Sequence, residues 1–106
     1  MARALISVPK IVRKGAEFEI KIIVSHPMET GYRVDDMGKP IARHIVKEFL
    51  CTYLGDEVFR AEMFPAISAN PYFSFFAVAE KTGPVVLSWI DDRGAREQES
   101  LVVAVE

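Results

Sequence analysis

Hydrophobic and polar residues alternate along much of this chain with a period of two. In the clearest run, Phe18, Ile20, Ile22 and Val24 alternate with the residues at 17, 19, 21 and 23, three of which are charged. This pattern is typical of a β-strand with one face on a core, because successive side chains of a strand point to opposite faces of the sheet. No segment has the apolar spacing of an amphipathic helix, so the sequence argues against a helical fold.

Several other segments alternate in the same way or are rich in aromatic and β-branched residues, and turn-forming residues separate many of them. The predicted strands are 4–8, 17–25, 44–53, 58–63, 72–79, 85–90 and 97–105. Seven short strands in 106 residues predict an all-β fold, an immunoglobulin-like antiparallel β-sandwich. At this length we expect a single domain spanning residues 1–106.

The alternation also assigns faces to individual side chains. Cys51 shares a face of its strand with Ile45, Phe49 and Tyr53, whereas Val46 lies on the other face. Cys51 is therefore expected to be a buried structural thiol. Trp89 shares a face with Val85 and Leu87, which predicts that its indole packs in the core. The aromatic residues of 72–76 alternate sides, so some of them must point away from the core.

Two connections are unusual. Residues 26–43 form an 18-residue link with two prolines and two glycines, far longer than the usual length of about 4 to 6 residues, which indicates an extra hairpin or an interaction loop. Residues 64–71 have a proline near each end and could carry the chain from one sheet to the other.

Charge excludes some classes of partner. The net charge is only −2, so the basic surface that nucleic acid or anionic lipid requires is absent, and no apolar run is long enough to span a membrane. The charge is uneven, however: residues 1–53 carry +3 and residues 54–106 carry −5. A dipolar surface of this kind suits pairing with another protein.

Residues for catalysis or metal binding are few. His26, His44 and Cys51 are the only histidines and the only cysteine, and zinc sites usually take three or four such ligands. We therefore expect no metal, no cofactor and no Cys–His catalysis, with His26 anchoring a loop by a hydrogen bond. The pairs 35–36 and 91–92 are aspartates beside glycines and are interpreted as turn formers.

Specific runs of sequence resemble one family. They are SHPMETGYR at 25–33, DDMGKPI at 35–41, CTY at 51–53, ANPY at 69–72 and SF at 74–75. Together they closely resemble the SoxZ family, the Z subunits of bacterial thiosulfate-oxidising carrier complexes. The likeness covers essentially the full length of the chain.

The resemblance implies a noncatalytic subunit that pairs with a Y subunit in a heterodimer. Sulfur intermediates are held on a cysteine in the glycine-rich C-terminal tail of that partner, and other sulfur-oxidising enzymes dock transiently. The resemblance further implies a periplasmic location, with the Y subunit supplying the export signal. This expectation agrees with the N-terminal 15 residues, whose apolar stretch is broken by Ser7, Pro9 and Lys10 and does not form a secretory signal.

The partner surface is expected to involve the two unusual connections. The candidate interface residues are Met28, Tyr32, Met37, Lys39, Phe64, Asn70 and Tyr72. We also expect the isolated chain to form homodimers through part of the same surface. Two alternative functions remain: a stand-alone immunoglobulin-like module that binds another protein, and a small redox or metal enzyme.

Overall fold

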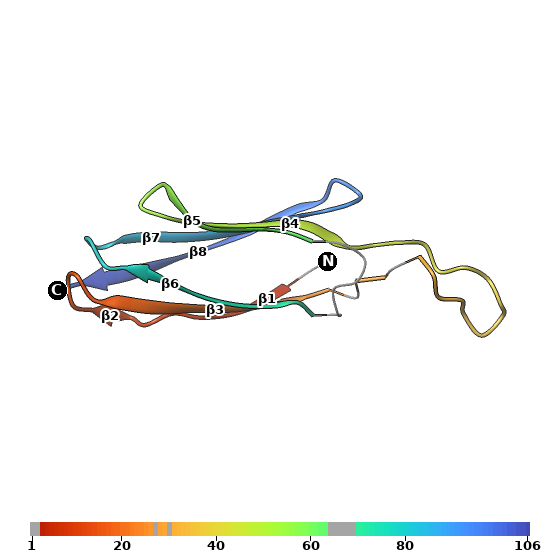
Figure 1. The fold of residues 1–106 in the computed structure, drawn as a ribbon, viewed down its shortest axis with the longest axis horizontal. Helices are drawn as coiled ribbons and strands as arrows, with labels where there is room; N and C mark the ends of the chain where they lie inside the picture. The colour runs from red at the N-terminus through yellow and green to blue at the C-terminus, as the bar shows by residue number, and fades with distance from the viewer. Residues whose placement is uncertain (1–2, 27, 30, 64–69) are drawn as a thin grey trace.

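Two β-sheets lie face to face in an elongated molecule whose principal extents are 57 × 20 × 19 Å (Figure 1). The computed structural model describes residues 3–26, 28–29, 31–63 and 70–106. Its strands are β1 (Arg3–Ser7), β2 (Ile11–Val12), β3 (Glu17–Ser25), β4 (Val46–Tyr53), β5 (Asp56–Glu62), β6 (Tyr72–Val78), β7 (Gly83–Asp91) and β8 (Arg96–Val105). The predicted immunoglobulin-like β-sandwich is confirmed, and each of the seven predicted strands is present with slightly different ends.

The smaller sheet has the order β1-β3-β6 and the larger one the order β2-β8-β7-β4-β5. All pairs are antiparallel except β2 with β8, where Ile11 lies opposite Ala104 in a parallel register. The sequence did not predict β2, because a strand of two residues is too short to show any alternation. The described residues contain no helix long and apolar enough to cross a bilayer.

The core lies between the sheets. Phe18, Ile20, Ile22 and Val24 are at most 3% exposed, as their alternation predicted. Trp89 is 4% exposed, which confirms its predicted place in the core. Aromatic rings cross between the sheets: Phe49 stacks on Phe73 with centroids 4.7 Å apart, and Phe59 stacks on Phe75 at 4.5 Å.

One predicted face was wrong. Val46 is fully buried, although the alternation placed it opposite Phe49 and Cys51. The register of β4 against β7 shifts between Val46 and Glu48. A bulge inserts an extra residue and so reverses the side-chain alternation on one side of it. As a result, Val46 and Phe49 both face the core.

Candidate functional site

The connection between β3 and β4 forms a narrow projection beyond one end of the sandwich (Figure 1). Its two arms are joined by reciprocal backbone hydrogen bonds of 2.8 Å between Glu29 and His44. Nearer the tip, Val34 bridges Pro40. All residues from 31 to 40 are exposed. The predicted extra hairpin is therefore present, although it is held by isolated bridges rather than by regular strands.

Asp35 shapes the tip of this projection. Its Oδ1 accepts hydrogen bonds from the amides of Met37 at 2.8 Å and Lys39 at 3.0 Å. Gly38 has φ 78, in the left-handed region that favours glycine. This confirms the turn-forming interpretation of Asp35 and leaves the Met37 side chain 83% exposed.

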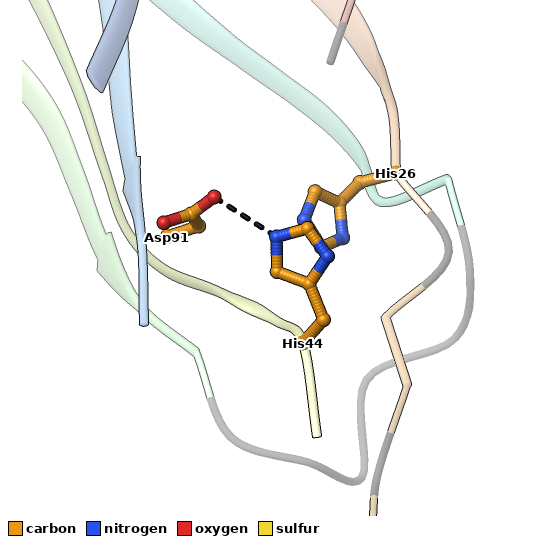
Figure 2. A group of neighbouring side chains, drawn as sticks. All are labelled: His26, His44 and Asp91. Carbon is orange, nitrogen blue, oxygen red and sulfur yellow. Dashed lines mark hydrogen bonds and ion pairs between the residues drawn. The ribbon is translucent and has the colours of Figure 1, made fainter. Parts of the chain in front are cut away.

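The projection joins the sandwich where three chemically versatile side chains meet (Figure 2). His26 directly follows β3, His44 lies just before β4, and Asp91 ends β7. His44 Nε2 lies 2.9 Å from Asp91 Oδ2, and the two imidazole centroids are 4.5 Å apart. We call these three residues the His–Asp cluster. Sequence analysis missed it, because the three residues are far apart in the chain. The pairing of β4 with β7 brings His44 near Asp91, whereas His26 follows a strand of the other sheet.

Asp91 is held from both sides. Its Oδ1 accepts hydrogen bonds from the amides of Arg93 and Ala95, each 2.9 Å long, which confirms its predicted turn-forming role. Burial by itself raises the pKa of Asp91, but the hydrogen bonds from His44 and from the Ala95 and Arg93 amides outweigh it and hold the pKa below its usual range. Asp91 is therefore ionised at neutral pH, and its Oδ2 faces His44.

His26 is 4% exposed and is fixed by its neighbours. Its amide donates to Asn70 Oδ1 at 3.0 Å, and its ring Nδ1 accepts from the Met28 amide at 3.0 Å. Nε2 is buried and has no hydrogen-bond partner among the described residues. Burial, and then the proximity of His44, lower the pKa of His26, so that its ring is neutral at neutral pH. The predicted loop-anchoring hydrogen bond is present, but it uses only one ring nitrogen.

The candidate interface residues differ in exposure. Tyr32, Met37 and Tyr72 are 88%, 83% and 56% exposed, and Lys39 is also exposed. Met28 is only 4% exposed, and its Sδ accepts a hydrogen bond from the Val46 amide at 3.3 Å. Asn70 is exposed, and Phe64 lies outside the described residues. Whether these seven residues contact a partner stays a prediction.

The strand register reveals an exposed surface that the sequence did not show. Leu5 lies opposite Ile23, which lies opposite Tyr72, so the three form one row across β1, β3 and β6. They lie on the outer face of the smaller sheet and are 75%, 37% and 56% exposed. We call them the apolar row. Alternation within one strand shows which side chains share a face, but only the pairing of strands shows that these three are neighbours.

Cys51 is fully buried in β4. Burial raises the pKa of its thiol to about 12. Its side chain faces the core, as predicted. The His–Asp cluster lies at the other end of β4, where His44 precedes the strand. The only thiol of the chain is therefore protonated and shielded from reagents at neutral pH.

The chain matches the model of one protein family. The model of the family described as sulphur oxidation protein SoxZ matches residues 6–102. No curated protein sequence matches the chain.

Three solved structures share this fold with the chain and are distant from it in sequence. A superoxide reductase (neelaredoxin) from Ignicoccus hospitalis is 18% identical with a TM-score of 0.72, over 97% of this chain and 80% of that one. A putative superoxide reductase from Thermotoga maritima is 18% identical with a TM-score of 0.72, over 97% and 85%. The sulfur carrier protein SoxY from Chlorobium limicola f. thiosulfatophilum is 17% identical with a TM-score of 0.69, over 97% and 78%. At these identities the similarity shows the fold alone.

Proposed function

The chain belongs to the SoxZ family of sulphur oxidation proteins, and we propose that it is the noncatalytic subunit of a sulfur-carrier heterodimer. Its partner is a SoxY-type subunit whose C-terminal cysteine holds the sulfur intermediates. The complex works in the periplasm, to which both subunits are exported together. Other enzymes of sulfur oxidation dock on it transiently.

The observation that carries this proposal is the state of Cys51. A cysteine that accepts a sulfur group must present a thiolate to the donor, since the thiolate is the nucleophile. Cys51 is fully buried, with a thiol pKa of about 12, and it is the only cysteine of the chain. In a sulfur carrier that contains this chain, the carrying thiol therefore belongs to another subunit.

The outer face of the smaller sheet supports the pairing. The apolar row of Leu5, Ile23 and Tyr72 crosses three strands, and Phe76, 59% exposed, lies on the same face. An apolar row on an outer sheet face is stabilised when another protein covers it. SoxY has the same fold as this chain, so each subunit has an outer sheet face that could pack against the other. We assign the apolar row to the SoxY-type subunit.

Co-expression of the chain with a SoxY-type subunit tests the proposal. The two are expected to elute together in size exclusion as a one-to-one complex, with roughly 1,200 Å² or more buried. After incubation with thiosulfate and the other enzymes of the system, mass spectrometry should find the sulfur adduct on the partner and none on Cys51. A complex with the Cys51→Ala substitution should load equally well.

Surface variants locate the contact. Leu5→Arg and Tyr72→Arg should weaken pairing, whereas Val102→Arg, a substitution at a side chain 67% exposed on the larger sheet, should not. Failure of the unmodified chain to elute with the partner would favour the stand-alone binding module instead. A sulfur adduct on Cys51 would refute the proposal.

A further inference from the structure

We propose that the His–Asp cluster binds one divalent transition-metal ion of the zinc class, through Nε2 of His26, Nε2 of His44 and Oδ2 of Asp91. The proposal is independent of the carrier function. It rests on the placement of three side chains and on one buried ring nitrogen that has no partner among the described residues.

The geometry is close to that of a coordination site. One ligand atom from each residue lies within 4.8 Å of the other two, and the His44–Asp91 pair is already 2.9 Å apart. Around a tetrahedral zinc with bonds of about 2.0–2.1 Å, ligand atoms are separated by about 3.3 Å. An ion would enter if the His26 ring moved toward the other two side chains and His44 Nε2 and Asp91 Oδ2 moved slightly apart. Two imidazoles and one carboxylate leave a fourth position for water.

The unpartnered Nε2 of His26 favours an ion over a purely structural cluster. The residue is only 4% exposed, and Figure 2 shows its ring beside His44 and Asp91. Buried polar atoms are almost always satisfied, because leaving one unpaired is unfavourable. His44 Nε2 cannot be the missing hydrogen-bond partner of His26 Nε2, because it is already hydrogen-bonded to Asp91 Oδ2. An ion between the two rings would satisfy His26 Nε2.

The surroundings hold the ligands in place. The Arg93 and Ala95 amides donate hydrogen bonds to Asp91 Oδ1, so Oδ2 is the carboxylate oxygen that can bind the ion. Asn70 fixes the backbone of His26 on the opposite side. The guanidinium of Arg43 is paired with Asp92 at 2.9 Å and does not compete for Asp91. Such orienting contacts around the ligands raise metal affinity.

Protons must move within the rings when the ion binds. His26 Nδ1 accepts from the Met28 amide, so its neutral ring carries the proton on Nε2. His44 carries its proton on Nε2 as well, since it donates to the ionised Asp91. Coordination through Nε2 transfers each proton to Nδ1 without net release. The Met28 amide then loses its acceptor, so the start of the projection must shift when the ion enters.

The test uses the full chain without an affinity tag, stripped of metal by a chelator. Titration calorimetry with Zn²⁺ should give one ion per chain, and Co²⁺ at the same site should give the visible absorption of a four- or five-coordinate ion. His44→Gln and Asp91→Asn should each weaken Zn²⁺ binding by at least about 10-fold. Asp56→Asn, at an exposed carboxylate outside the cluster, is the matched control and should bind as the unmodified chain does.

Nitrogen NMR of the imidazoles gives a readout that does not depend on variants. The chain has two histidines, so two ring spin systems are observed. With one equivalent of Zn²⁺, both rings should change from the Nε2–H to the Nδ1–H tautomer together. Unchanged ring signals in the presence of one equivalent of Zn²⁺, or equal Zn²⁺ binding by His44→Gln and the unmodified chain, would overturn the proposal.

Discussion

The side-chain oxygen of Asn70 accepts a hydrogen bond from the His26 amide at 3.0 Å, while the Asn70 amide donates to the His26 carbonyl at 2.8 Å. This pair of hydrogen bonds joins His26, the residue after β3, to Asn70, two residues before β6. It requires an unusual backbone, because Asn70 has φ 53. Asparagine and glycine tolerate this left-handed conformation better than other residues do.

Asn70 should therefore stabilise the fold in two separable ways. Asn70→Gly keeps the backbone conformation accessible and removes only the side-chain hydrogen bond, so we expect a loss of about 0.5–1.5 kcal/mol. Asn70→Ala adds the left-handed strain and should lose about 1 kcal/mol more. Urea denaturation measures both. Equal stability of the two variants would show that the backbone conformation contributes nothing.

Cys51 should react slowly with thiol reagents in the native protein. Its thiol pKa is about 12, so at pH 8 it is almost entirely protonated, and its side chain is fully buried. In urea the thiol recovers a pKa of about 8.5 and should react rapidly. Labelling followed by absorbance compares the two rates. Equal rates in buffer and in urea would contradict the buried position.

The same pKa gives a pH dependence of stability. Above about pH 9 the unfolded chain loses the thiol proton while the folded chain keeps it, because the folded pKa is higher. The unfolded state then binds fewer protons, so the free energy of unfolding should fall as the pH rises toward 12. Cys51→Ala removes this contribution. Urea midpoints measured from about pH 8 to 10.5 should decline less steeply in that variant.

Trp89→Ala should cost roughly 3–5 kcal/mol, as removal of a large buried aromatic side chain usually does. Its indole is 4% exposed. The indole Nε1 has no hydrogen-bond partner among the described residues, so Trp89→Phe loses volume but no hydrogen bond and should be much milder. Thermal or urea unfolding distinguishes the two. A midpoint for Trp89→Ala equal to that of the unmodified chain would place the ring at the surface.

The isolated chain should form homodimers through the apolar row, because no partner then covers it. Dimers should increase with concentration in light scattering. Tyr72→Arg places a charge in the row and should yield monomers, while Val102→Arg on the larger sheet should leave the dimer intact. A monomer at all concentrations would remove the self-association hypothesis.

The sequence predicted what depends on neighbours along the chain. The seven principal strands, the buried faces of β3 and β7, and the turns at Asp35 and Asp91 all follow from alternation and local turn chemistry. It could not predict the bulge after Val46, because the hydrophobic pattern of one strand does not show where its register against the neighbouring strand shifts. The sequence also could not predict which distant segments of the chain come into contact. The apolar row exists because β1, β3 and β6 pair in one register, and the His–Asp cluster exists because β4 pairs with β7 while the end of β3 lies against them from the other sheet.

The parallel pairing of β2 with β8 determines when the molecule can finish folding. Ile11 lies opposite Ala104 and Val12 opposite Val105, so almost the whole chain separates the paired residues. Closing so large a loop is entropically unfavourable until the intervening strands are in place. Sandwiches dominated by such distant pairings fold in milliseconds to seconds. β2 pairs only with β8 in the larger sheet, so it has no partner strand there until β8 has been synthesised and has joined the sheet.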